Sequence, residues 1–439
     1  MEISLEDIKE FSKEYNNNPI NKIIENAIVA NGLEETCLNK DIITENQFVF
    51  NIELPDSKRY NQKDSWKCWI FAGLNMIKHN MAKNLDINLM NFELSSNYIA
   101  FFDKLEKSNY VYENIIHLPQ NADLDFIKKE KIIDYCVDEG GYWEYFKGII
   151  GKYGVIPNTY MPNPIEGERV PIINRLYREK VKKDIAFLWE AKQQGKDDEN
   201  LRNMKKEFIK ENYILLSKIL GEPPHTFDYE YRDKNNKYIR IENLTPKDFV
   251  TQYLTLNLEE FVKIGNVPMY NKEYGKIYQE KYSGNIYEKY KVKFLNLPIE
   301  DLKNMAVQQL KDGIPVYMSI HTLKSRYEKK GILDTRIYNY EQTLGITPLS
   351  KKEGFDFSEI HSNHAMVFNG VHIVDGKTQR WKVEDSYGIE EKPNGYYIMN
   401  DNFFEKFIHS IIVHKKYLTE EQRKLLEQEP IEYILETNI

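Results

Sequence analysis

The sequence predicts an α+β protein that carries a mainly helical inserted domain. Residues 1–164 are dominated by helical patterns, residues 165–290 contain long charged helices, and residues 291–439 are rich in short strand patterns. A helical beginning and a strand-rich end that are separated by charged helices favour a core interrupted by an insertion. The length of 439 residues agrees with about three structural units of roughly 150 residues each.

The N-terminal part contains two well-defined helical patterns. From Trp69 to about Met81, apolar residues recur at intervals of three and four, which predicts a helix with one buried stripe. A second helix is predicted within FELSSNYIAFFDKLEKSNYVYENII, with Ser95 or Ser96 as its N-cap.

The predicted insertion has a different composition. PIINRLYREKVKKDIAFLWEAKQQ and DENLRNMKKEFIKENYILLSKIL are long, amphipathic and highly charged, and the Lys/Glu alternation is most simply a solvated helix face. After about residue 290 the runs GIPVYMSI, HAMVFNGVHIV, RWKVEDSYG and GYYIM predict strands, because they are rich in β-branched and aromatic residues.

Charge and hydropathy exclude several classes of protein. The 60 Lys and Arg residues against 68 Asp and Glu residues give a net charge of −8, which argues against a dedicated nucleic-acid binder. No window of 18 residues is apolar enough to span a membrane, and the acidic start MEISLEDIKEFSKEY does not resemble a secretory signal. Three scattered cysteines, Cys37, Cys68 and Cys136, favour the reducing cytoplasm.

Cys68 is the first candidate catalytic residue. A lone cysteine is usually a small buried hydrophobe, but Cys68 opens the predicted helix, where free backbone N–H groups and the helix dipole favour a thiolate. Gln62 lies six residues earlier in a polar loop. Its side-chain amide is a candidate second donor of an oxyanion hole, beside the N–H of Cys68.

His364, in SNHAMVFNGV, is the candidate base for this thiol. The simplest alternative is a structural histidine in a buried strand. Asp385 follows in RWKVEDSYG, and its carboxylate can accept the second ring N–H and fix the tautomer of His364. His361 and His364 could alternatively form an H-x-x-H pair that binds a metal ion. No third ligand has supporting spacing, so neither a metal nor another cofactor is expected.

Gly140 and Gly141, in CVDEGGYWEYFKGII, are candidate substrate-binding residues. They are either a loop before a helix or a stretch of backbone without side chains, along which an extended peptide can pair. Trp66 stands close to Cys68 and is a candidate aromatic residue of a cleft wall.

Taken together, NQKDSWKCWIFAGLN, FELSSNYIAFFDKLEKSNYVYENII, EGGYW, SNHAMVFNGV, WKVEDSYG and LEQEPI resemble the bleomycin hydrolase/aminopeptidase C family, a cytosolic branch of the papain-like cysteine peptidases. The resemblance runs in order over nearly the whole chain. It implies a papain-like core of two lobes with a helical insertion, and a homohexamer whose active sites face an internal channel.

Position by position, the resemblance implies that Cys68 is the nucleophile, Gln62 the oxyanion donor and His364 the general base and acid. Asp385 stands where the family has the asparagine that orients the histidine. Gly140 and Gly141 align with the glycine pair along the substrate backbone.

The chain departs from the family pattern near the nucleophile. Asp385 replaces asparagine, which we expect to preserve activity with a shifted pH profile. Trp66 replaces a glycine, so a positive φ at this position would strain the backbone. Tyr387 replaces the usual tryptophan beside the histidine.

The C-terminus departs as well. After LEQEPI the chain ends in EYILETNI, which lacks the family's Trp-Asp-Pro-Met-Gly run and is a few residues shorter. In aminopeptidase members this arm lies in the cleft and limits the length of bound peptide.

The expected function is therefore that of a cytoplasmic cysteine peptidase that trims short peptides from the N-terminus by Cys-His-Asp acyl transfer. Two alternatives stay open: an oligopeptide endopeptidase on the same scaffold, and a catalytically impaired oligomeric binding shell.

Overall fold

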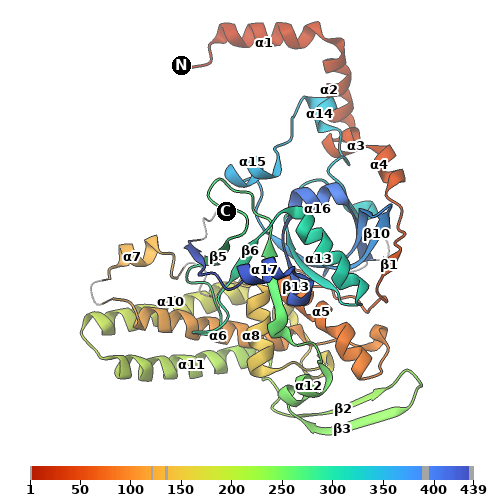
Figure 1. The fold of residues 1–439 in the computed structure, drawn as a ribbon. Helices are drawn as coiled ribbons and strands as arrows, with labels where there is room; N and C mark the ends of the chain where they lie inside the picture. The colour runs from red at the N-terminus through yellow and green to blue at the C-terminus, as the bar shows by residue number, and fades with distance from the viewer. Residues whose placement is uncertain (1, 120–121, 134–136, 388–394, 435–439) are drawn as a thin grey trace.

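The computed structural model describes residues 2–119, 122–133, 137–387 and 395–434. They form two packed lobes and an N-terminal arm that projects from them (Figure 1). The arm is built of α1 (Leu5–Asn17) and α2 (Pro19–Asn31), in which no residue is buried. Two short helices, α3 (Leu33–Cys37) and α4 (Lys40–Glu45), connect the arm to the body.

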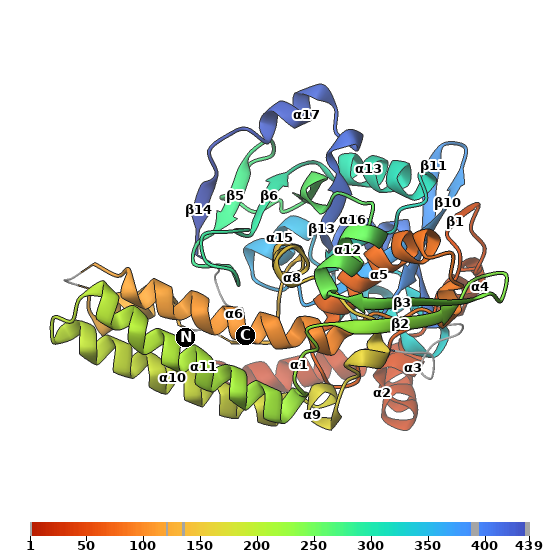
Figure 2. The ribbon, with the colours of Figure 1, turned by 90° about the horizontal axis from the view of Figure 1, so that it is seen from below.

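The first lobe is mainly helical and contains the long helices expected for the insertion. Its elements are α5 (Cys68–Asn84), α6 (Ser96–Ile116), α7 (Leu124–Lys129), α8 (Trp143–Tyr153), α9 (Ile165–Glu168), α10 (Pro171–Gln193), α11 (Asp198–Leu220), the hairpin β2 (Phe227–Arg232) and β3 (Tyr238–Leu244), and α12 (Pro246–Tyr253). Figure 2 shows α6, α10 and α11 side by side.

The helices predicted from periodicity are confirmed. Residues 69–81 lie within α5, and the long charged runs form α10 and α11. Ser95 caps α6, because its hydroxyl accepts a 3.0 Å hydrogen bond from the backbone N–H of Tyr98.

The second lobe is built on a sheet of twelve strands, in the order β14-β5-β6-β4-β13-β7-β10-β11-β12-β9-β8, with β1 paired to β10. The strands are β1 (Ile52–Glu53), β4 (Phe261–Gly265), β5 (Ile277–Glu280), β6 (Lys293–Asn296), β7 (Val316–Ile320), β8 (Arg326–Tyr327), β9 (Ile332–Leu333), β10 (His364–Val374), β11 (Lys377–Glu384), β12 (Tyr396–Asn400), β13 (Ile408–His414) and β14 (Ile431–Tyr433). Its helices are α13 (Ile299–Lys311), α14 (Tyr340–Leu344), α15 (Lys351–Asp356), α16 (Asp401–Phe407) and α17 (Glu420–Leu425).

The strand-rich part starts earlier than residue 290. β4 and β5 lie within the range expected for the helical insertion, yet both pair in the large sheet. Lys263, Gln279 and Glu280 interrupt the apolar pattern of these two strands and are nevertheless buried. Because the strands are short and carry buried polar residues, they lack the signal that marks the later strands.

The two lobes have separate apolar cores that meet at β10. Ala365 and Val367 belong to the core of the first lobe, whereas Met366 and Phe368 belong to the core of the second. Because side chains of a strand alternate between its faces, β10 contributes to both cores at once. α5 packs against β10, so the helix that begins with Cys68 lies next to the strand that begins with His364.

No helix in the described part of the chain combines the length and the apolar character needed to cross a membrane.

Candidate active site

Cys68 lies at the N-terminus of α5, at the edge of a cleft of about 1130 Å³ between the lobes. It is half-buried and forms no disulfide. Its backbone N–H has no hydrogen-bond partner among the described residues. Residues further along the helix are buried on almost every side, including Trp69, Ile70 and Phe71. The sulfur therefore sits on a rigid support and next to a free helix-terminal donor.

His364, at the start of β10, also lines this cleft and hydrogen-bonds the sulfur of Cys68. Its Nε2 donates a hydrogen bond of 2.8 Å to Oδ1 of Asp385, which follows β11. β10 and β11 pair in antiparallel fashion, and this pairing brings Asp385 beside the imidazole. A carboxylate can only accept, so the hydrogen of this bond is on Nε2 and Nδ1 is left to interact with Cys68.

The charges of this group favour an imidazolium. Burial opposes protonation of His364, but the negative charges of Cys68 and Asp385, and the hydrogen bonds to both, raise its pKa to about 10. Asp385 is held in turn by the backbone N–H of Ser386, which donates to its Oδ1 at 2.7 Å. The arrangement can hold a thiolate–imidazolium pair at neutral pH.

Gln62 is 2% exposed and is fixed by the residues that follow Asp385. Its backbone N–H donates to the carbonyl of Ser386 at 2.5 Å, and the hydroxyl of Ser386 donates to its Oε1 at 2.6 Å. Because Oε1 is engaged, the other end of the side chain is the donor Nε2, which bonds the hydroxyl of Tyr387. The structure thus brings Gln62 to the segment of Asp385, through Ser386 and Tyr387.

Two tyrosines complete the surroundings of the sulfur. Tyr387 stacks on the ring of His364, with ring centroids 5.4 Å apart. Burial, together with the charges of Cys68 and Asp385, raises its pKa. Tyr317, from β7, lines the cleft and is fully buried, and burial with the charge of Cys68 raises its pKa far above the usual value. Nothing in the sequence pattern of β7 distinguishes Tyr317 from an ordinary core aromatic.

Gly140 and Gly141 also line the cleft, before α8. A Cβ on Gly141 would lie 2.5 Å from the indole of Trp69, so only glycine fits, whereas a Cβ on Gly140 would meet nothing within 4 Å. The carbonyl of Gly140 accepts a 2.7 Å hydrogen bond from Lys107. The N–H and C=O of Gly141 make no hydrogen bond within the described residues, so both are free to pair with an extended peptide.

Trp66 lies at the wall of the same cleft and is 51% exposed. Its φ of 53° places it in the left-handed region, which is unfavourable for a bulky residue. The strain expected if a positive φ occurred here is therefore present. Its indole N–H donates to Oδ1 of Asp64 at 3.1 Å, which fixes the ring.

The C-terminal arm reaches the cleft. β14 pairs in parallel with β5, with Tyr433 opposite Glu280, and the backbone N–H of Lys281 donates to the carbonyl of Tyr433 at 2.8 Å. Tyr433 and Ile434 line the cleft that contains Cys68 and His364. Residues 435–439, the last part of the expected arm, lie outside the described residues, as does Cys136.

Within the described ranges, no group of three or more His, Cys, Asp or Glu side chains is arranged to hold a metal ion. His361 contacts the ring of His321, with centroids 5.1 Å apart.

Comparisons with known proteins show the family and the fold that this chain shares with them. The model of the Peptidase C1-like family matches residues 2–435. The chain is 36% identical to aminopeptidase C of Listeria monocytogenes over 431 residues, which cover 98% of this chain and 96% of that protein. It is 35% identical to aminopeptidase G of Lactobacillus delbrueckii subsp. lactis over 433 residues, with 98% of both chains covered. The crystal structure of PepW from Lactobacillus rhamnosis superposes with a TM-score of 0.93 at 34% identity and covers 97% of this chain and 95% of that one. The fold class predicted from the sequence is confirmed.

Proposed function

The chain belongs to the Peptidase C1-like family and is a cysteine-type aminopeptidase of papain-like fold, and from this premise we propose that it trims short peptides through Cys68, His364 and Asp385. The observation that carries the proposal is the chain of contacts from the sulfur to the imidazole to the buried carboxylate.

In the proposed reaction, the thiolate of Cys68 attacks the carbonyl carbon of the scissile bond. A carbon–sulfur bond forms, and the carbonyl electrons move to the oxygen. When the intermediate collapses, the C–N bond breaks and the proton of the His364 imidazolium passes to the leaving amine. The neutral imidazole then takes a proton from water, whose oxygen attacks the thioester and releases the new carboxylate and the thiolate.

The oxyanion needs donors next to the sulfur. The free backbone N–H of Cys68 supplies one, supported by the N-terminal end of α5. We assign the second to Nε2 of Gln62, whose orientation is fixed by Ser386. The free N–H and C=O of Gly141 would hold the substrate backbone in extended form.

Cleavage from the N-terminus is supported by the C-terminal arm. Because Tyr433 and Ile434 line the cleft, the arm occupies room that a longer bound peptide would need. We propose that the arm makes the enzyme an exopeptidase rather than an endopeptidase.

The test compares a leucyl coumarylamide that has a free amino group with its N-acetylated counterpart. Rapid cleavage of the free form alone is expected. Equal cleavage of both forms would rule out the aminopeptidase and leave the endopeptidase. Cys68→Ala should abolish cleavage, and Cys37→Ser, a buried cysteine outside the cleft, should not.

Alkylation with iodoacetamide distinguishes the active peptidase from the catalytically impaired binding shell. A reactive thiolate predicts that Cys68 is modified near neutral pH much faster than Cys37. Equal rates would support the binding shell.

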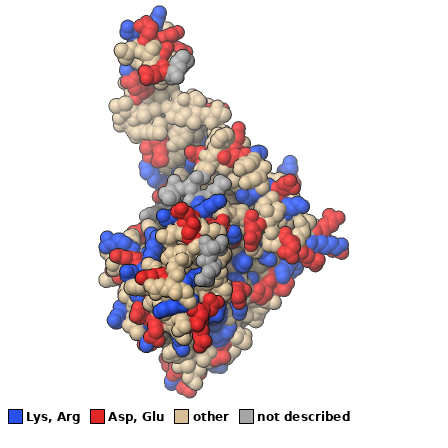
Figure 3. Space-filling view, turned by 90° about the vertical axis from the view of Figure 1, so that its left-hand side faces the viewer, with Lys and Arg blue, Asp and Glu red and all other residues tan. Residues whose placement is uncertain are grey.

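We further propose that copies of this chain assemble, as the homohexamer implied by the resemblance, through the N-terminal arm. Isolated helices of 13 residues are marginal in water, yet α1 and α2 bury nothing, and Ile8, Phe11 and Ile23 are 51%, 55% and 67% exposed. The arm forms the projection at the top of Figure 3, with an area free of charged side chains below its tip. A second copy would bury these apolar side chains.

Light scattering tests this assembly. The double variant Ile8→Asp and Phe11→Asp should reduce the mass in solution, and Lys13→Glu, on the same helix, should leave it unchanged. A monomeric wild-type protein would refute the assembly. We also propose a cytoplasmic location, which the unpaired Cys37 and Cys68 support.

A further inference from the structure

A second cavity, of about 430 Å³, adjoins the catalytic cleft and is not needed by the reaction described above. Trp66, Asn174 and Arg178 line both the cleft and this cavity, so the two spaces are continuous past these side chains. Trp66 precedes Cys68 by two residues. The cavity therefore opens beside the nucleophile, on the side of α10.

Two buried hydrogen-bond donors, which belong to lining side chains, have no partner in the part of the chain that the structure describes. Asn174 is 4% exposed, and its Oδ1 accepts a 2.7 Å hydrogen bond from Nζ of Lys104. An ammonium can only donate, so this bond fixes the amide and makes the unpartnered atom, Nδ2, a donor. Nε of Arg178 is also buried, and no acceptor for it is present among the described residues.

These donors lie on one face of α10, because Asn174 and Arg178 are four residues apart. A buried donor without an acceptor is costly to leave unsatisfied, and both donors belong to side chains that line the cavity. The geometry thus calls for a ligand group that accepts hydrogen bonds.

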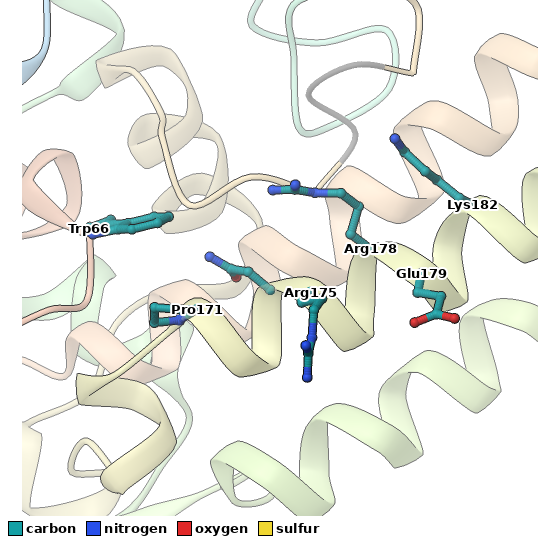
Figure 4. A pocket seen from close by; sticks show the side chains of 7 residues that line it. Trp66, Pro171, Arg175, Arg178, Glu179 and Lys182 are labelled. Atoms are coloured by element: carbon teal, nitrogen blue, oxygen red, sulfur yellow. The ribbon is translucent and has the colours of Figure 1, made fainter. Parts of the chain in front are cut away.

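The charged side chains of the cavity indicate which kind of hydrogen-bond acceptor the ligand carries. Figure 4 shows the guanidinium of Arg178 extending toward Trp66, with Lys182 further along the same helix. Arg175 and Glu179 also line the cavity, so its lining has three cationic side chains and one carboxylate. Arg178 pairs with Asp138, and Lys182 has no ion-pair partner in the described part of the chain. A carboxylate only accepts hydrogen bonds and is attracted by both cations.

Trp66 supplies the apolar part of the site. Its indole N–H is engaged by Asp64, so the exposed ring can only offer contact area. Pro171 adds a second apolar surface. A side chain with a short methylene stem and a terminal carboxylate matches these two surfaces and the donors beyond them.

We propose that this cavity binds the side chain of the N-terminal residue of the substrate and selects a glutamate there. The inference rests on the proposed aminopeptidase function, because in such a substrate the acyl group transferred to Cys68 is a single residue. The side chain of that residue leaves the cleft past Trp66, and its carboxylate lies against the side chains of Asn174 and Arg178, which line both spaces.

The experiment measures kcat/KM for glutamyl, glutaminyl and leucyl coumarylamides with free amino groups. Glutamine has the same length as glutamate but no charge, so the Glu/Gln ratio reports on the carboxylate. Charge-assisted hydrogen bonds predict a ratio of about ten or more. A ratio near one in the wild-type enzyme overturns the inference. Failure to cleave even the leucyl reporter would instead refute the proposed function.

The decisive variant is Asn174→Asp, which keeps the oxygen that accepts from Lys104 and replaces the donor by a second acceptor. It should lower the Glu/Gln ratio about tenfold while cleavage of the leucyl reporter continues. Arg178→Gln should lower the ratio as well and serves if Asn174→Asp does not fold. Lys183→Ala removes a cation of α10 outside the cavity lining and should leave the ratio unchanged. Unchanged ratios in folded Asn174→Asp and Arg178→Gln would overturn the proposal.

Discussion

Replacing Asp385 by asparagine should move the alkaline limit of activity. In the structure, Oδ1 of Asp385 lies 2.8 Å from Nε2 of His364, and both groups are buried. Burial opposes the charge of His364, but Cys68 and Asp385 raise its pKa to about 10. Because the pKa is raised, the imidazolium is present at neutral pH and is lost only as the pH rises through about 10.

The size of the effect follows from the charge that is removed. An opposite charge at this distance shifts a pKa by about 1–3 units. Asp385→Asn keeps an oxygen that accepts the ring N–H but removes the charge, so the alkaline limb of kcat/KM should fall by about 1–3 pH units with activity at pH 7 preserved. Asp385→Ala also removes the acceptor that orients the ring, and should lower kcat/KM about 100-fold.

The assay is the pH profile of kcat/KM with the leucyl reporter between about pH 5 and about pH 11, so that the wild-type alkaline limb lies inside the range. Asp312→Asn, which changes an exposed carboxylate paired with Lys416, is the matched control. An alkaline limb that does not move in Asp385→Asn would show that the carboxylate does not set the imidazole's charge. An Asp385→Ala enzyme as active as the wild type would refute the role of Asp385 altogether.

Three further predictions concern the walls of the cleft. Gly141→Ala should lower both stability and kcat/KM, because its Cβ would lie 2.5 Å from Trp69, and Gly140→Ala should leave stability within about 1 kcal/mol; equal melting temperatures of the two variants would contradict this. Trp66→Gly should raise the free energy of unfolding by about 1 kcal/mol in urea titrations, since glycine tolerates the φ of 53°, and a loss of stability would argue against strain. Burial raises the pKa of Glu280 from 4.5 to about 7, so the folded state favours the protonated acid and stability should fall as the pH rises from 4.5 to 7. Glu280→Gln should remove about 3 kcal/mol of this pH dependence, and an unchanged dependence between pH 5 and pH 8 would exclude Glu280 as its source.

The sequence predicts the helices better than the strands. α5 and α6 follow a clear apolar period and have an identifiable start, so their positions agree with the structure. β4 and β5 are not predicted from the sequence, because each contains a charged residue, Lys263 or Glu280, that normally indicates an exposed position. Both residues are buried only because the tertiary fold encloses them.

Part of the site is similarly accessible from the sequence. Cys68 and His364 stand in recognisable motifs, and Asp385 follows a strand that pairs with the strand of His364, so their contact could be anticipated. Asn174 and Trp66 are more than 100 residues apart and belong to no common pattern. Nδ2 of Asn174 has no partner among the described residues because Lys104, on α6, fixes the orientation of the amide. This contact is visible only in the folded structure.

The position of β10 between two cores has a consequence for mutation and selection. Methyl groups removed from Val367 on one side, or from Met366 on the other, would loosen the same backbone that carries the imidazole. Loss of packing in the core of either lobe would thereby change the position of His364 and lower the catalytic rate. Core substitutions in either lobe should therefore lower peptidase activity together with stability. A measurement of kcat/KM would then also detect packing defects far from the sulfur of Cys68.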